Sequence, residues 1–263
     1  MNELIISVIT YGLTYFTSIF LGKMYGGTKK NLSKKQKILW MLIIALAPAI
    51  LAGIRYGVGT DYNNYLSIYG YIKYYLISDY IISYFDGSGL HIEVLYYLLN
   101  RIVFLLFDSG QMVFFFSMLI ELLFILLGLQ YFKEKISIPW ALFIFYMLMF
   151  NTGLNSVRQS IAVSILFFAF KYILDKKIIK YLFFVIIASL FHTTAIIFIF
   201  LYLLVNLKNK EISAFRNIIM YLCVLFSPLL SYAALKFASN TELFSRYFSD
   251  QTIQNNLSVG FLF

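Results

Sequence analysis

The chain has 263 residues, of which 61% are hydrophobic, 20% aromatic and only 13% charged. This composition excludes an ordinary soluble protein and is typical of a membrane protein. Because lipid offers the backbone no hydrogen bonds, apolar runs of this kind cross a bilayer as helices. The sequence therefore predicts an all-α fold: a polytopic integral membrane helical bundle with about eight transmembrane segments.

The formal charge of +9 lies in short loops rather than along one continuous basic face. Such loops set the orientation of a membrane protein and contact lipid headgroups, so we expect the lipid bilayer as a partner and no nucleic acid. Cys223 is the only cysteine, and the chain has two histidines. We therefore expect no disulfide, no metal site and no cofactor.

The first apolar run, Leu4 to Gly22, has neither the basic start nor the cleavage site of a signal peptide, and predicts a retained helix. Six lysines and no acidic residue lie between Lys23 and Lys37, which marks a cytoplasmic loop. The next helix, Ile38 to Ile54, then leads Arg55 and Asp61 to the outer face.

On that face, Leu66 to Phe85 is rich in tyrosine and predicts an amphipathic helix in the membrane interface. The remaining predicted apolar segments are Ile92 to Phe107, Met112 to Leu129, Ile138 to Phe150, Ser156 to Leu174, Tyr181 to Val205 and Ile218 to Leu235. We expect Tyr181 to Val205 to run outward as one segment with His192 near its middle.

The number of predicted membrane crossings disagrees with the positions of the basic loops. Lys171 to Lys180 is a second basic stretch, so an even number of crossings must separate it from the first cytoplasmic loop. Five apolar segments lie between the two. Either Leu66 to Phe85 also crosses, or Ile92 to Phe107 is re-entrant.

The last residues, Val259 to Phe263, resemble the start of a further span. Five residues are too few to cross a hydrocarbon layer of about 30 Å. We therefore expect residues 1–263 to be a single polytopic transmembrane domain that is incomplete at its C-terminus.

The stretch from Asn151 to Ala162 carries Arg158 and Gln159 at the outer mouth of an apolar helix. A charged group at that depth is costly unless it has a partner or a function. The planar guanidinium suits a pair of phosphate oxygens, and Gln159 and Asn155 would add neutral contacts. The alternative is that Arg158 is only an interfacial anchor.

Further polar residues lie at or near the predicted outer boundary. Arg55 is either a second phosphate contact or an ion-pair partner of Asp61, which is otherwise a candidate base. Glu93 is the other candidate base, unless it only favours a helix N-terminus. His192 is either a hydrogen-bond donor to substrate or a structural donor. Glu121 is expected to be structural.

Four segments together resemble the EpsG family of bacterial membrane proteins from exopolysaccharide and capsule clusters. They are Arg55 to Tyr65, Tyr96 to Asn100, Asn155 to Ala162 and Ala188 to Ala195. The resemblance implies a polymerase of the Wzy type, located in the bacterial cytoplasmic membrane as a multi-pass protein. Its substrate would be an oligosaccharide carried on undecaprenyl diphosphate, and its partners would include flippase and chain-length regulator proteins.

The same resemblance implies glycosyl transfer on the outer face of the membrane. Arg55 and Arg158, with Gln159 and Asn155, would bind the diphosphate and glycan. The catalytic residues would be Asp61 or Glu93 at the attacking hydroxyl, with His192 as a supporting donor. Two alternatives remain: a transporter or flippase of lipid-linked sugars, and a noncatalytic component of the polysaccharide assembly machinery.

Overall fold

The computed structural model describes residues 2–28, 32–86, 92–206, 217–218, 221–222 and 225–226. The chain divides into two compact units, Met1–Asn206 and Leu207–Phe263. The account below concerns the first unit. The span expected at Ile218 to Leu235 falls mostly, and Val259 to Phe263 wholly, outside the described residues.

The described part of the chain is helical and contains no β-strand, which confirms the predicted polytopic helical class. Its four longest apolar helices have the length and composition needed to cross a membrane. These are α1 (Asn2–Gly26), α2 (Lys34–Ile54), α6 (Gly110–Phe132) and α9 (Val157–Leu174). Shorter apolar helices are α5 (Val94–Phe107), α7 (Ile138–Leu148), α10 (Ile178–Ser189), the 3₁₀ helix η1 (Thr193–Phe198) and α11 (Ile199–Asn206).

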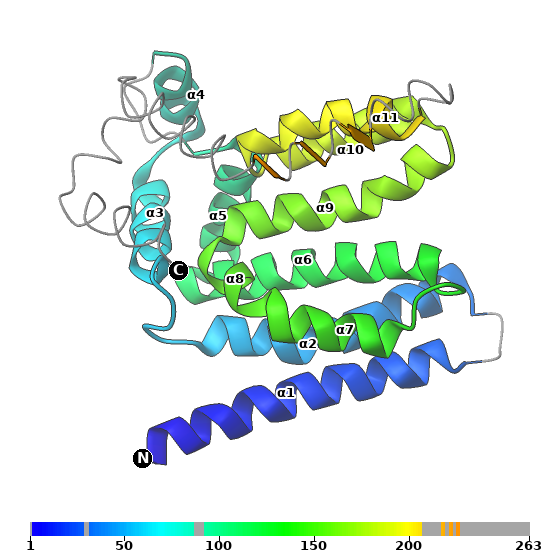
Figure 1. Cartoon of the computed structure of the whole chain (residues 1–263). Coiled ribbons are helices and arrows are strands. Elements are labelled where there is room, and N and C mark those ends of the chain that lie inside the picture. The colour runs from blue at the N-terminus through cyan, green and yellow to red at the C-terminus, as the bar shows by residue number, and fades with distance from the viewer. Residues whose placement is uncertain are drawn as a thin grey trace. The chain divides into compact units, whose positions relative to one another are not determined.

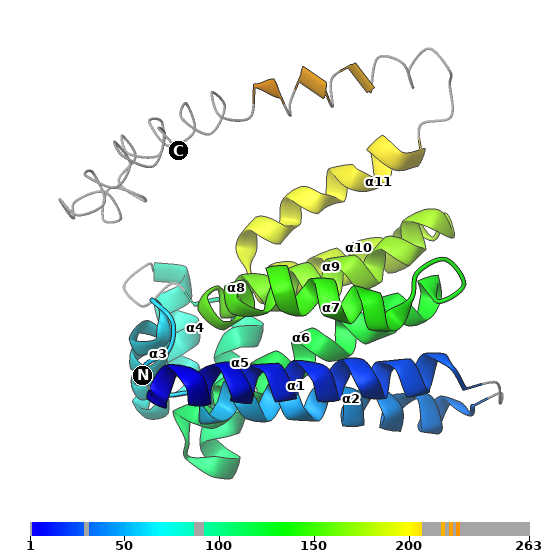
Figure 2. The same cartoon turned by 60° about the horizontal axis from the view of Figure 1, so that its bottom comes forward.

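Helix α6 is the centre of the bundle. It is apolar around most of its circumference and packs against α2 on one side and α9 on the other. Helices α1 and α7 add to the α2 side, whereas α10 packs on α9 (Figures 1 and 2). The interior consequently contains two hydrophobic clusters, one around α2, α6 and α7 and one around α5, α9 and α10.

The two ends of the bundle differ in chemistry. The C-terminal ends of α1, α6 and α9 lie together at the right-hand end in Figure 1. Lys23, Lys133 and Lys171 lie at or beside these helix ends. At the opposite end, α3 (Tyr62–Tyr74), α4 (Ile77–Asp86) and α5 form a cap (Figure 1). The expected single interfacial helix over Leu66 to Phe85 is thus two helices.

Helix α5 does not cross from one end of the bundle to the other. Near its start, the Leu95 amide donates to the carbonyl of Leu190 (2.9 Å). Asp108, at its other end, accepts from Tyr69 (3.1 Å) and Lys73 (2.7 Å) of α3. Both ends of α5 therefore lie at the cap end of the bundle, and the re-entrant alternative fits the structure. With α5 re-entrant, the segments between the two basic loops that are left to cross are α2, α6, α9 and the shorter α7 with its extension α8 (Phe150–Asn155). Their number is even, as the two basic loops require.

The prediction of one continuous segment from Tyr181 to Val205 is wrong. Helix α10 ends at Ser189, and His192 lies in extended backbone before η1 begins. The physical reason is local: Ser, His and Thr side chains favour turns and caps over helix interiors, and they cluster between Ser189 and Thr194. Nδ1 of His192 lies 3.2 Å from Oε1 of Glu93, the N-cap residue of α5, so His192 is at the cap end, not at mid-membrane.

Close packing of α2 on α6 depends on Gly53. A Cβ atom at this position would lie 3.0 Å from Phe115 Cβ and 3.6 Å from the carbonyl oxygen of Gln111. We expect Gly53→Val to push the helices apart and to lower the free energy of unfolding by about 1–3 kcal/mol. Thermal unfolding of the purified protein in detergent measures this.

Gly12 in α1 is the matched control, because no atom lies within 4 Å of a Cβ built there. Gly12→Val should leave the melting temperature nearly unchanged. Equal melting temperatures for Gly53→Val and Gly12→Val would contradict the role assigned to this contact.

Candidate functional site

Glu93 joins three separate segments at the cap end of the bundle. Its Oε2 accepts a hydrogen bond from Arg158 Nη1 at 2.6 Å. Its Oε1 accepts from the backbone amide of Thr193 at 3.2 Å and lies 3.2 Å from Nδ1 of His192. The start of α5, the start of α9 and the break after α10 are thereby held together by one carboxylate.

Local structure explains why these groups meet. Glu93 is the N-cap residue of α5, but its side chain makes no cap hydrogen bond to that helix. It turns instead toward Arg158, the second residue of α9. The extended backbone at His192 aims the Thr193 amide at the same carboxylate. The alternative role of Glu93 as a helix N-terminal acid thus explains its position at the start of α5. It does not explain why its side chain contacts α9 and the segment after α10.

The pair between Glu93 and Arg158 is largely removed from solvent. The Glu93 side chain is 11% exposed and that of Arg158 26%. Burial raises the pKa of Glu93, but His192, the Arg158 charge and the Thr193 amide together outweigh it and lower the pKa to about 2. Glu93 is therefore ionised throughout the physiological range and is a weak proton acceptor.

Arg55, at the C-terminal end of α2, is the second buried guanidinium, with 5% of the residue exposed. Its Nη1 donates to the carbonyl oxygen of Leu154 at 2.7 Å. Its charge lies 4.2 Å from the centre of the Phe114 ring, which is a cation–π contact. Within the described residues, no ion pair joins Arg55 to Asp61, so the alternative of a mutual pair does not hold.

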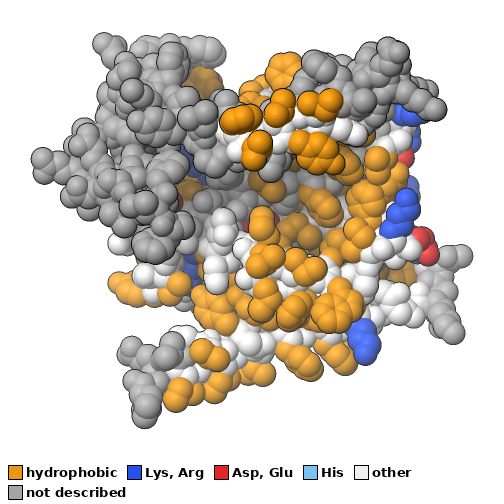
Figure 3. Space-filling view, viewed as in Figure 1, with side chains coloured by type: hydrophobic (Ala, Val, Ile, Leu, Met, Phe, Trp, Pro, Cys, Tyr) orange, Lys and Arg blue, Asp and Glu red, His pale blue; other side chains and the backbone are white. Residues whose placement is uncertain are grey.

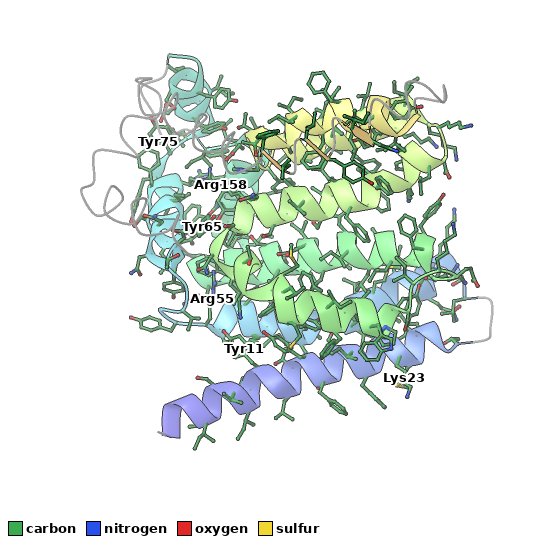
Figure 4. The ribbon with its side chains drawn as sticks, in the orientation of Figure 1. Tyr11, Lys23, Arg55, Tyr65, Tyr75 and Arg158 are labelled. Carbon is green, nitrogen blue, oxygen red and sulfur yellow. The ribbon has the colours of Figure 1, made fainter. Side chains whose placement is uncertain are left out.

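Two tyrosines connect the arginines, and the sequence did not single them out. The Tyr65 hydroxyl hydrogen-bonds the Arg158 side chain, and the Tyr96 ring lies 5.9 Å from the Arg158 charge. Both hydroxyls are also near enough to Arg55 to interact with its charge. Figure 4 shows Arg55, Tyr65 and Arg158 in one column at the cap end, with Lys23 at the far end.

The other predicted site residues occupy different places. Asn155 ends α8, and a Cβ on Gly59 would clash with its Oδ1, so the side chain packs on the Gly59 backbone. Asp61 has no side-chain partner in the described part of the chain. Burial is the main cause that raises the pKa of Tyr65, and the Asp61 charge raises it further. Gln159 is exposed and makes no side-chain hydrogen bond to this cluster.

Several buried polar atoms around the two arginines have no hydrogen-bond partner among the described residues. They are Nε of Arg55, Nε of Arg158, the Tyr96 hydroxyl and Oδ1 of Asn155. Oδ1 of Asn155 accepts hydrogen bonds, whereas the other three atoms belong to groups that donate them. Most buried polar groups in proteins are paired, so such a set beside two arginines is unusual. No group of three or more metal-ligating side chains occurs in the described ranges.

The surface of the bundle in Figure 3 also shows that its two ends differ in charge. Hydrophobic side chains cover the middle of the surface in Figure 3, and most of the visible lysines and arginines lie along its right-hand edge. That edge is the end opposite to Arg55 and Arg158 (Figure 4). The arginine cluster thus lies at the end of the bundle away from most of the visible basic side chains, and cytoplasmic loops typically carry an excess of such side chains.

Comparison with known families decides the classification. The sequence profile of the EpsG family matches residues 38–263, which is most of the chain. The protein belongs to the EpsG family. This membership and the four helices long enough to span a membrane make it a membrane protein with a polymerase-like role in polysaccharide biosynthesis. Searches of curated proteins and of solved structures each found no match.

The electrostatics of Glu93 in this EpsG protein predict a pH dependence of stability. The pKa of Glu93 is lowered from 4.5 to about 2 in the folded protein, so its contribution is fully present above 4.5 and is lost as the pH falls through that range. Near neutral pH, Glu93→Gln should reduce the free energy of unfolding by roughly 2–3 kcal/mol. Thermal unfolding at a series of pH values measures the difference.

Glu134→Gln is the control, because that side chain is 84% exposed in a loop at the other end. It should unfold like the wild type at every pH. A wild-type advantage over Glu93→Gln that stays constant between neutral pH and about 3 would contradict the assigned ionisation.

Proposed function

We propose that this protein is a Wzy-type polymerase of the bacterial cytoplasmic membrane. It would join oligosaccharide repeat units, carried on undecaprenyl diphosphate, into exopolysaccharide or capsular polysaccharide on the outer face. Family membership supports the polysaccharide role. The observation that carries the rest concerns two arginines, Arg55 buried and Arg158 half-buried. Their Nε–H donors have no hydrogen-bond partner among the described residues.

A diphosphate is the ligand that suits these donors. Arg55 is held by a carbonyl and an aromatic ring, and within the described part of the chain no acidic side chain forms an ion pair with it. Its full positive charge is thus available to a ligand. Arg158 is paired through Nη1, which leaves other donors of its five-donor fork for an anionic oxygen.

The reaction requires the protein to stabilise the leaving diphosphate and to accept a proton from the attacking hydroxyl. The bond between the anomeric carbon of the growing glycan and its diphosphate breaks, and a hydroxyl of the acceptor repeat unit forms the new glycosidic bond. The departing diphosphate gains negative charge, which Arg55 and Arg158 would stabilise. The proton leaves the acceptor hydroxyl, and the carboxyl group of Asp61, which has no side-chain partner among the described residues, would receive it.

Glu93 and His192 take supporting roles in this scheme. Glu93 is strongly acidic and both of its oxygens are in contact with neighbours, so it would fix the Arg158 fork rather than accept a proton. His192, 3.2 Å from Glu93, would donate to an oxygen of the substrate. Asn155 would contribute from the side of Arg55.

The test is the length distribution of cell-surface and lipid-linked glycan in the producing strain. We expect Arg158→Lys to keep the positive charge but lose the fork, and to reduce long chains roughly 10- to 100-fold. Single repeat units should accumulate on the outer leaflet. Protein amounts in the membrane are measured in parallel, so that loss of protein is recognised.

Arg101→Lys is the matched control. Arg101 lies at the same end of the bundle, but its Nη1 donates only to the backbone carbonyls of Ile72 and Lys73. It should retain long glycan. Repeat units that accumulate on the cytoplasmic leaflet in Arg158→Lys would instead show a transporter or flippase, and an unchanged profile would leave Arg158 as an anchor.

A further inference from the structure

The middle of the bundle contains a buried acid that the proposed reaction does not use. Glu121 lies in α6 with 5% of its surface exposed, and no hydrogen bond or ion pair of its carboxyl group is present in the described part of the chain. Ionised carboxyl groups in such a setting carry a large desolvation cost unless a cation or several donors compensate it. The neutral acid avoids this cost.

The surroundings of Glu121 supply no such compensation. From α8, Gly153 faces the carboxyl group, and a Cβ there would lie 2.9 Å from both carboxyl oxygens. From α7, the nearest titratable group is Tyr146, whose hydroxyl bonds Ser18 at 2.5 Å. From α2, Arg55 directs its Nη1 to the Leu154 carbonyl, and no ion pair joins it to Glu121.

A small cavity adjoins this acid. Its volume is about 10 Å³, which is close to the room that one water molecule needs. Glu121 lines it together with Ser117, one helical turn earlier on α6, and Arg55. The Oγ atom of Ser117 is buried and has no hydrogen-bond partner among the described residues. Buried waters are found where two to four otherwise unpaired polar groups surround a space of this size.

We propose that Glu121 is a neutral carboxylic acid that holds one buried water together with Ser117. This unit fills the cavity beside Arg55 and supports its position. The acid donates its O–H to the water, and the water donates to Ser117 Oγ. Because Glu121 packs on Gly153, it sets the position of α8, whose next residue, Leu154, accepts the hydrogen bond of Arg55. Glu121 is therefore a positioning residue.

Infrared difference spectroscopy of the purified full chain tests this directly, and it needs no activity or substrate. A protonated carboxyl group absorbs above the amide I band, where ionised carboxylates do not. We expect the wild type near neutral pH to show such a band, shifted in heavy water, and Glu121→Gln to lack it. Identical spectra for the two proteins in this region would overturn the proposal.

A second pair of variants tests the water. Ser117→Ala removes one of its partners and should shift the carboxyl band of Glu121. Ser164→Ala is the control, because Ser164 is equally buried but bonds Ile161 of its own helix at 2.7 Å. Its spectrum should match the wild type. A band that is the same in Ser117→Ala and Ser164→Ala would overturn the assignment of a shared water.

Discussion

The contact between Glu93 and Arg158 is the interaction on which the rest of the site depends. It joins α5 to α9, and through Thr193 and His192 it also fixes the break after α10. Removal of one partner would leave the other charge buried and unpaired, which costs far more than an exposed pair is worth. The re-entrant path of α5 and the reversal after α10 both bring backbone to this carboxylate.

The two arginines are held by different means, and the difference has a chemical consequence. Arg158 is neutralised in part by Glu93, whereas Arg55 has a carbonyl and an aromatic ring as its neighbours. Tyr65 and Tyr96 lie within range of both charges. The cluster thus keeps an excess of positive charge at low exposure, and this is the condition under which an anion binds strongly.

The sequence predicted the helical membrane class and singled out the lysine-rich loops and the segments that carry the arginines. Each of these depends on local composition or on charge that is readable along the chain. It did not predict that Glu93 contacts Arg158, because 65 residues separate them and the contact depends on the re-entrant path of α5. Likewise, the break at His192 was not predicted, because the helical segments before and after it are equally hydrophobic and read as one apolar run from Tyr181 to Val205.

Binding of undecaprenyl diphosphate by the purified full chain in lipid nanodiscs tests the central claim most directly. The comparison is between the wild type, Arg55→Lys and Arg158→Lys, with undecaprenyl monophosphate as the competing ligand. If the arginines form a diphosphate site, the wild type should prefer the diphosphate and each variant should lose at least about tenfold in affinity. Equal affinity of all three proteins for the diphosphate would contradict the account.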